Sequence, residues 1–249
     1  MESLKEELDR WGEAGRCAEL WWRDDDAGAP RPELAQLLDL TQGIGIPLHL
    51  AVIPAQARAD LFAGRKVVHP VRLLPHGWSH LNHEPAGSFP SELGDARPLG
   101  VTLTEIAKGV SRLRELFGAE QVLPVLVPPW HSISRKVAEN LPQIGIRGLS
   151  TLGSRKLPLG ALSIVQINAH VDVINWLNAP SFIGFERALS QLLDQLRARR
   201  MSRTDAHEPV GLLTHHWAID HECWKFLESV GRMVNGHPSA KWIVPDWSS

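Results

Sequence analysis

The sequence predicts an α/β fold in which seven or eight parallel strands alternate with helices around a distorted barrel. Short apolar runs and helical patterns alternate roughly seven or eight times along the 249 residues, which is typical of parallel strands joined by helical crossovers. The candidate functional side chains fall just after predicted strands, and in a β/α barrel such positions meet at one mouth. An open doubly wound sheet would align them along one edge, but no glycine-rich phosphate loop supports a nucleotide-binding version.

The predicted strands are apolar runs bounded by turn-forming or charged residues. They cover residues 19–23, 47–53, 71–74, 123–127, 148–151, 164–168, 210–214 and 241–244. The run at 47–53 is apolar enough to be buried, and Pro54 closes it. Residues 84–100 are rich in Pro, Gly and Ser, so we expect a long surface loop there, next to His76 and His80.

The predicted helices have apolar residues three and four positions apart. They cover residues 3–15, 32–41, 102–117, 134–144, 185–200 and 220–234. Pro32 begins the second helix and Gly43 is expected to end it, whereas Pro142 is expected to interrupt the fourth. Thr102 and Glu105 have the spacing of a capping box at the start of the third.

Composition excludes several classes of protein. Lys plus Arg number 26 against 28 acidic residues, which gives no electrostatic case for nucleic acid or an anionic membrane as the main partner. Cys17 and Cys223 are far apart and belong to no C-x-x-C pattern, so we expect two reduced thiols rather than a disulfide or a thiolate zinc site.

The same reading sets expectations for location and domain organisation. No apolar run approaches the ~20 residues needed to span a bilayer, and the N-terminus, charged from Glu2 onward, does not resemble a signal peptide. We therefore expect a soluble, cytoplasmic protein. No linker divides the sequence, so residues 1–18 are expected to form a helical extension and residues 19–249 a single catalytic domain.

Two groups of residues indicate metal chemistry. Asp24, Asp25 and Asp26 follow the first predicted strand, and adjacent carboxylates usually require a cation or serve as a base. His76 and His80 are four residues apart, a spacing that turns both imidazoles toward one point on a helical turn. Two imidazoles and one carboxylate leave a coordination position for water, as in catalytic metal sites. We interpret the chain as a metal-dependent hydrolase.

Residues 19–245 resemble the polysaccharide deacetylases, the NodB-like carbohydrate esterases of family four: four of the family's five short motifs are recognisable, and the third is kept only in part. The segments concerned follow one another in the family's order. They are the aspartates, His76-x-x-x-His80, Pro128-Pro129-Trp130, Asp172-Val173-Ile174-Asn175-Trp176 and Leu213-Thr214-His215. The resemblance implies a distorted NodB-like barrel. Two departures stand out: Gly77 replaces the family's Ser or Thr, and Val127 occupies the place of its third-motif arginine. Arg23 or Arg72 is expected to substitute for that arginine.

The resemblance also implies a reaction, namely hydrolysis of an N- or O-linked acetyl group by a metal-activated water. The implied metal ligands are Asp26, His76 and His80. The implied catalytic residues are Asp25 as general base, His215 as general acid and Asp172 as the group that orients it. The implied substrate contacts are Trp130, Trp176, Pro129 and His216.

Several alternatives remain open at this stage. The triple acid leaves the assignment of Asp24, Asp25 and Asp26 uncertain by one residue, and His83 could complete another ligand set. Asp-His-His suits zinc, cobalt or nickel, and availability favours zinc. The expected partner is an acetylated sugar or glycoconjugate, and the oligomeric state is not determined. Two other functions compete: a metal-dependent amidase acting on a small non-sugar amide, and a carbohydrate-binding relative without turnover.

Overall fold

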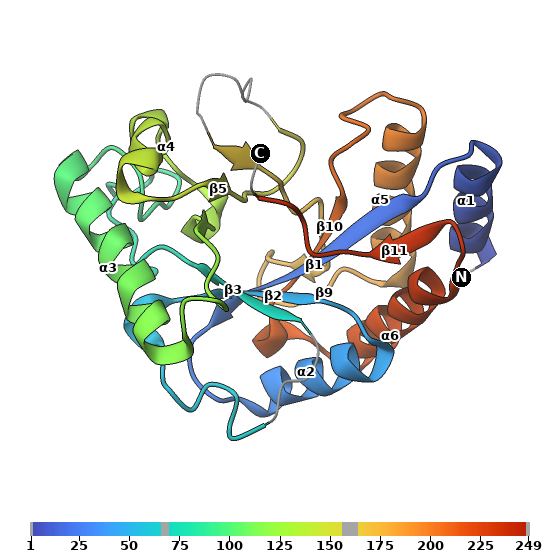
Figure 1. The fold of residues 1–249 in the computed structure, drawn as a ribbon, viewed down its shortest axis with the longest axis horizontal. Coiled ribbons are helices and arrows are strands. Elements are labelled where there is room, and N and C mark those ends of the chain that lie inside the picture. The colour runs from blue at the N-terminus through green and yellow to red at the C-terminus, as the bar shows by residue number, and fades with distance from the viewer. Residues whose placement is uncertain (1, 66–69, 156–163, 248–249) are drawn as a thin grey trace.

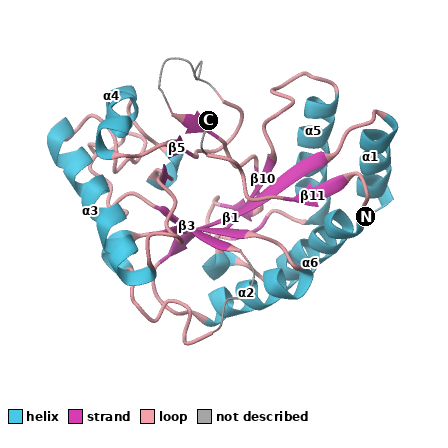
Figure 2. Cartoon of the chain, in the orientation of Figure 1, coloured by secondary structure: helices cyan, strands magenta, loops and turns pink. Residues whose placement is uncertain are grey.

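A ring of parallel strands surrounded by helices forms the centre of the molecule (Figures 1 and 2). The computed structural model describes residues 2–65, 70–155 and 164–247. Its main parallel sheet has the order β3-β2-β1-β10-β7. These strands are β1 (Ala18–Ala27), β2 (Leu48–Val52), β3 (Val71–Pro75), β7 (Val171–Asp172) and β10 (Val210–Thr214).

A second parallel sheet closes the ring. It has the order β4-β5-β6 and consists of β4 (Val125–Leu126), β5 (Gly148–Leu149) and β6 (Val165–Gln166). Isolated bridges join β3 to the β4 segment at Leu73–Val122 and His76–Val127, and Leu152–Ala169 joins the β5 segment to the residues before β7. The predicted barrel is thus confirmed, and its distortion lies on the side of the two-residue strands. The remaining strands are β8 (Ile174–Asn175), β9 (Ser181–Phe182) and β11 (Ala240–Trp242), which pairs with β1.

The first strand is longer than predicted and includes all three acids. Asp24 pairs with Thr214 of β10 and with Leu50 of β2, so the ladder continues past Arg23. The prediction that the acids follow the strand is therefore wrong. The register with β2 shifts between Asp24 and Ala27, and Asp26 has a φ of 68°. Such a shift is typical of a β-bulge. This irregularity redirects Asp26 at the end of the strand.

Six α-helices among the described residues cover the outside of the ring (Figure 2). They are α1 (Glu2–Glu13), α2 (Pro32–Ile44), α3 (Leu99–Phe117), α4 (Arg135–Asn140), α5 (Phe185–Arg200) and α6 (His221–Gly236). In the same described part of the chain, four short 3-10 helices follow strands or helices: η1 (Pro54–Gln56), η2 (Pro129–His131), η3 (Leu141–Ile144) and η5 (His216–Ala218). The interruption expected at Pro142 is confirmed, since α4 gives way to η3.

Two predicted helix ends were wrong. α2 continues beyond Gly43 and ends at Gly45, which adopts the left-handed conformation that glycine tolerates best. α3 begins before the expected capping box, with Pro98 preceding its first residue. Thr102 is consequently buried inside the helix, and Glu105 pairs with Arg97 at 2.7 Å instead of capping it.

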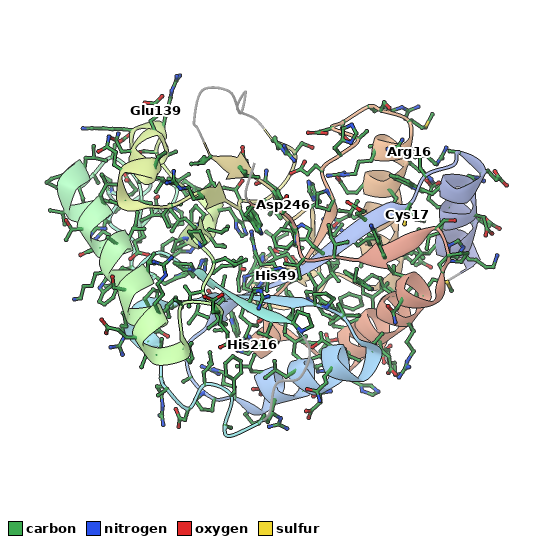
Figure 3. All side chains as sticks on the ribbon, viewed as in Figure 1. Arg16, Cys17, His49, Glu139, His216 and Asp246 are labelled. Carbon is green, nitrogen blue, oxygen red and sulfur yellow. The ribbon has the colours of Figure 1, made fainter. Side chains whose placement is uncertain are left out.

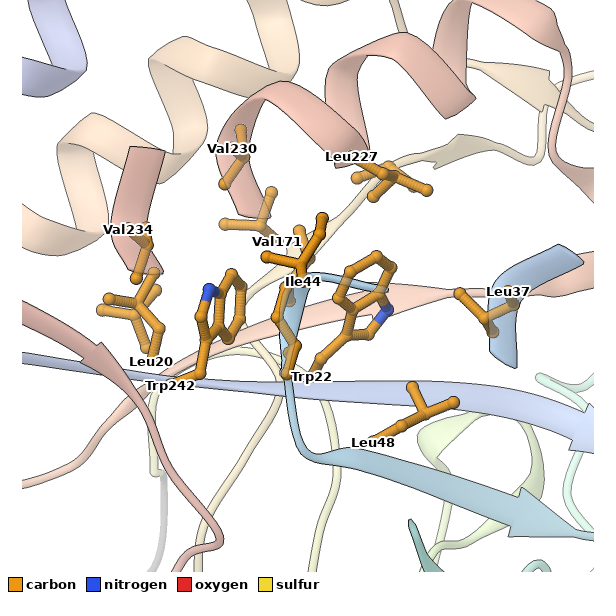
Figure 4. Close-up of a cluster of buried hydrophobic side chains, with 14 of the residues drawn as sticks. Leu20, Trp22, Leu37, Ile44, Leu48, Val171, Leu227, Val230, Val234 and Trp242 are labelled. Atoms are coloured by element: carbon orange, nitrogen blue, oxygen red, sulfur yellow. The ribbon is translucent and has the colours of Figure 1, made fainter. Parts of the chain in front are cut away.

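The alternation of side chains along β1 separates two apolar cores. Trp22 packs between the ring and the outer helices, where its ring lies 6.0 Å from that of Trp242 and beneath α6 (Figure 4). Trp21 points to the opposite face of β1 and packs inside the ring, 6.0 Å from the ring of Trp247. Residues of odd number at the end of β1, including Arg23 and Asp25, therefore face the interior of the ring.

The N-terminal helix is integrated into the outer core. Leu4, Leu8 and Trp11 are buried with that cluster, and buried Glu7 accepts a hydrogen bond of 2.8 Å from Arg200 of α5. The division into residues 1–18 and 19–249 stays a prediction.

Two further expectations from composition can be compared with the structure. Cys17, next to Arg16 in Figure 3, and Cys223 are both free cysteines. Among the described residues, no helix is both long and apolar enough to cross a membrane.

Candidate active site

The two predicted histidine ligands lie in an irregular loop and not on a helical turn. β3 ends at Pro75, and the following residues up to His80 are not helical. Gly77 and His80 have φ values of 58° and 57°, which a right-handed helical turn excludes. The prediction of a helical turn is therefore wrong. The imidazoles of His76 and His80 nevertheless lie 5.1 Å apart, measured between ring centroids.

Asp26 completes a three-residue group with these histidines. Its Oδ1 lies 3.2 Å from His76 Nε2 and 3.4 Å from His80 Nε2, and the three ligand atoms are within 4.8 Å of one another. His76 Nδ1 donates to the carbonyl of Val127 at 2.8 Å, a contact that fixes the tautomer and leaves Nε2 free to bind a metal. His83 is not part of this group.

The group fits a divalent metal. Among the described residues, no donor reaches buried Asp26 Oδ1 with hydrogen-bond geometry, although its other oxygen accepts a bond of 3.2 Å from Trp217 Nε1. A buried oxygen without a donor is costly, and a cation facing Oδ1 and two imidazole nitrogens would remove that cost. Burial raises the pKa of Asp26, but His76, His215 and His80 outweigh this effect and hold the pKa well below its usual range.

Asp25 is buried beside the group formed by Asp26, His76 and His80, and it is paired with Arg23. Arg23 Nε donates to Asp25 Oδ1 at 2.8 Å and its second terminal nitrogen donates to Oδ2 at 3.1 Å. Burial alone would raise the pKa of Asp25, but Arg23 and His76 outweigh it and lower the pKa below its usual value. Of the two arginines expected to substitute for the missing one, Arg23 is the one that pairs with Asp25. Arg72 lies on β3 opposite His49.

Asp24 lies on the other face of β1 and does not reach the site. Its carboxylate accepts a hydrogen bond of 2.6 Å from Thr214 Oγ1 and lies 2.6 Å from His216 Nδ1. His216 begins η5, which packs against α2 outside the ring (Figure 3). Burial lowers the pKa of His216, but Asp24 outweighs burial and raises it. His216, predicted as a substrate contact, is thus placed away from the other site residues.

A cavity of about 490 Å³ contains the remaining groups. It is lined by Asp25, Asp26, His76, His80, Phe89, Pro90, Trp130, His131, Leu152, Asp172, Trp176, His215 and Trp217. Eight of the ten predicted site residues line it, and Pro129 and His216 do not. Pro129 instead packs beside Gly77.

His215 and Asp172 are connected through Trp176 and not directly. Asp172 Oδ2 accepts a hydrogen bond of 2.8 Å from Trp176 Nε1, and its Oδ1 accepts one of 2.9 Å from the Ile174 N–H. The Trp176 ring meets the His215 ring edge-on at 4.6 Å. Burial raises the pKa of Asp172. His215 Nδ1 is buried and has no hydrogen-bond partner among the described residues.

Five residues of the cavity were not predicted as site residues, namely Phe89, Pro90, His131, Leu152 and Trp217. Trp217 contacts Asp26, and the adjacent His215-His216 pair could have pointed to it. Phe89 comes from the predicted surface loop beside the histidines. His131 Nδ1 lies 3.4 Å from an Arg23 nitrogen, and burial together with Arg23 lowers its pKa to about 3. His131 is therefore a neutral imidazole facing the cavity.

Comparison with known proteins shows which solved structures share this fold. No protein-family model and no curated protein matches the sequence. Among solved structures, a Mycobacterium smegmatis protein named as a polysaccharide deacetylase matches with a TM-score of 0.67 and 15% identity, covering 92% of this chain and 87% of that one. The chain has the fold of the polysaccharide deacetylases.

Two further solved structures have this fold and a similarly low sequence identity to the chain. The catalytic domain of a peptidoglycan N-acetylglucosamine deacetylase from Eubacterium rectale matches with a TM-score of 0.57 and 12% identity, covering 94% of this chain and 90% of that one. A family 4 acetyl xylan esterase from Clostridium thermocellum, in complex with a cobalt ion, has a TM-score of 0.50 and 11% identity, with coverages of 84% and 80%. The resemblance drawn from the motifs is confirmed at the level of the fold.

Proposed function

We propose that the protein is a metal-dependent hydrolase that removes acetyl groups from a carbohydrate or glycoconjugate. The observation that carries this proposal is the meeting of Asp26, His76 and His80 beside the ionised, buried Asp25 in one cavity. The deacetylases and esterases that share the fold support the substrate class.

The metal would be held by Asp26, His76 and His80. Zinc is favoured by availability, and cobalt and nickel suit the same ligands. The cobalt complex of the Clostridium thermocellum esterase supports a divalent metal without deciding which one. When bound, such an ion polarises the acyl carbonyl and lowers the pKa of a water.

Asp25 is assigned the role of general base. Arg23 keeps its carboxylate ionised and fixes both oxygens, so the carboxylate can accept the proton that the attacking water releases. The water oxygen forms a bond to the acyl carbon, and the backbone N–H of Trp130 is the group assigned to hold the resulting oxyanion.

His215 is assigned the role of general acid. As the bond between the acyl carbon and the leaving nitrogen or oxygen breaks, His215 gives that atom a proton, and acetate and an amine or alcohol result. Trp176 lies against the His215 ring and is held in turn by Asp172. Asp172 thereby positions the acid indirectly.

A second candidate is hydrolysis of a small non-sugar amide, and the lining of the cavity favours it. The lining side chains that do not titrate are all apolar or aromatic: Phe89, Pro90, Trp130, Leu152, Trp176 and Trp217. Sugar hydroxyls would therefore find hydrogen-bond partners mainly among the reactive groups. The third alternative, a relative without turnover, would follow from the loss of the third-motif arginine at Val127, and the Arg23–Asp25 ion pair weakens it.

Metal content and product release test the proposal together. Elemental measurement on the purified protein should find one divalent metal per chain. His76→Ala should lose both metal and activity, whereas His215→Ala should retain metal and lose turnover by roughly 10²–10⁴-fold. Acetate release from acetylated sugars, assayed beside amine release from small amides, distinguishes the two substrates. Full activity in either variant would contradict the assigned roles.

A further inference from the structure

We propose that Glu92 is a positioning residue that holds the His76–His80 loop in its metal-binding shape and tightens metal binding through His80. This inference rests on the proposed metal site. Glu92 belongs to the loop before α3, twelve residues beyond His80, and is 1% exposed. No motif in the sequence points to it.

The Glu92 carboxylate binds successive backbone N–H groups of the loop. The Ser79 N–H donates to Oε1 at 2.7 Å, the His80 N–H donates to Oε2 at 3.2 Å, and the Trp78 N–H lies 3.2 Å from both oxygens. The Ser79 hydroxyl adds a bond of 3.1 Å. Consecutive N–H groups around one anion form a nest, so the carboxylate fixes the loop that carries His80.

Gly77 makes room for this carboxylate. A Cβ at position 77 would overlap Glu92 Oε2 and would lie 2.8 Å from the Pro129 ring. The φ of 58° at Gly77 also disfavours any other residue. The absence of a side chain at position 77 and the buried acid at position 92 are therefore two parts of one arrangement.

The backbone around Glu92 is attached to the neighbouring wall of the cavity. Leu93 forms a bridge with Ile133, Ser91 Oγ donates to the Ser132 carbonyl at 3.2 Å, and Arg97 donates to the Glu92 carbonyl at 3.2 Å. These contacts fix the main chain of Glu92 and its two neighbours. Glu92 can impose a conformation on His80, whose φ of 57° is unfavourable for a residue other than glycine.

The charge of Glu92 favours a cation nearby. Among the described residues, no Lys, Arg or His forms an ion pair with its carboxylate, which accepts hydrogen bonds only from neutral N–H and O–H groups. A divalent ion bound to His80 would be attracted by this buried negative charge. Glu92 therefore contributes to metal binding through position and through charge, without touching the metal.

Glu92→Gln tests the inference, because glutamine keeps the size of the side chain but removes the charge and half of its acceptor capacity. We expect zinc affinity, measured by competition with a chromophoric chelator, to fall by about 10–100-fold. The visible absorption bands of the cobalt-loaded protein should also shift. Glu7→Gln is the matched control, since Glu7 is equally buried but pairs with Arg200 of α5 outside the ring; it should leave both readouts unchanged.

A double-variant cycle separates this role from general stability. Because the positional part of the effect acts through His80, Glu92→Gln should lower the zinc affinity of His80→Ala by clearly less than it lowers that of the wild type. Glu92→Asp, which keeps the charge but shortens the side chain, should bind zinc with intermediate affinity and provides a second variant if Glu92→Gln folds poorly. Wild-type zinc affinity and cobalt spectrum in Glu92→Gln, or additive effects of the two substitutions, would overturn the inference. If the wild-type protein itself binds no metal, the proposed function fails instead.

Discussion

Among substitutions that leave the reacting groups in place, Arg23→Gln should cause the largest loss in the free energy of unfolding. Arg23 donates two hydrogen bonds to Asp25, one of 2.6 Å to Ser150 Oγ and one of 3.1 Å to the Thr151 carbonyl. Both Arg23 and Asp25 are almost fully buried. Removing one partner of such a pair costs about 3–5 kcal/mol of the free energy of unfolding, because the other charge is left buried without compensation.

The pH dependence of this loss follows from the pKa of Asp25. In the wild-type protein that pKa lies below its ordinary value, so the ion pair contributes stability above about pH 4 and loses it as the pH falls through the folded-state pKa. In Arg23→Gln burial is no longer opposed by Arg23, and the pKa of Asp25 rises. The difference in stability between variant and wild type should therefore be largest near neutral pH and shrink in acid.

Two assays measure these effects. Urea unfolding at several pH values gives the difference in the free energy of unfolding between Arg23→Gln and the wild type. In the pH profile of kcat/KM, the acidic limb of Arg23→Gln should lie at higher pH than that of the wild type, since Asp25 must be ionised to act as a base. Arg72→Gln is the matched control, because Arg72 also lies on a barrel strand but does not pair with Asp25. Arg23→Gln combined with Asp25→Asn should recover much of the lost stability without activity. An Arg23→Gln variant as stable as Arg72→Gln, with an unchanged acidic limb, would refute the reasoning.

Two further predictions concern the acid and the metal. Trp176→Phe removes one hydrogen bond to Asp172 but keeps a ring beside His215. It should lower kcat roughly three- to tenfold, as expected for the loss of about 1 kcal/mol, and leave the metal content unchanged. An unchanged kcat would exclude the indirect role of Asp172. Zinc at 100 times its Kd should raise the free energy of unfolding of the metal-stripped protein by about 2.7 kcal/mol. Calorimetry should detect this rise in the wild type and not in His76→Ala. An equal rise in both proteins would show that zinc binds elsewhere.

Much of the fold could be predicted because its strands are short apolar runs between turn-forming residues. Residues 185–200 and 210–214 were predicted with the observed bounds. The meeting of Asp26, His76 and His80 was also predictable, since the carboxyl ends of parallel strands share one mouth.

Features that depend on packing were harder to predict. Three acids resemble a strand terminator, yet β1 continues because its backbone pairs on both sides. With β1 extended, its two-residue period would have placed Arg23 beside Asp25 and would have decided against Arg72. Glu92 carries no signal at all, because a loop residue becomes functional only through the backbone that it contacts after folding.

The pairing of β1 has a consequence for synthesis of the protein. β1 is completed at residue 27, but its neighbours β10 and β11 lie about 185 to 215 residues later in the chain. At about 5–20 residues per second, the nascent chain waits roughly 10–40 s before β11 emerges from translation. During that interval the edge of β1 that later pairs with β10 has no partner strand, although β2 is already available for the other edge. An unpaired strand edge that includes Trp21 and Trp22 is a recognised aggregation hazard. Ribosome-bound chains truncated before β10 should accordingly bind holdase chaperones, and extension through β11 should release them.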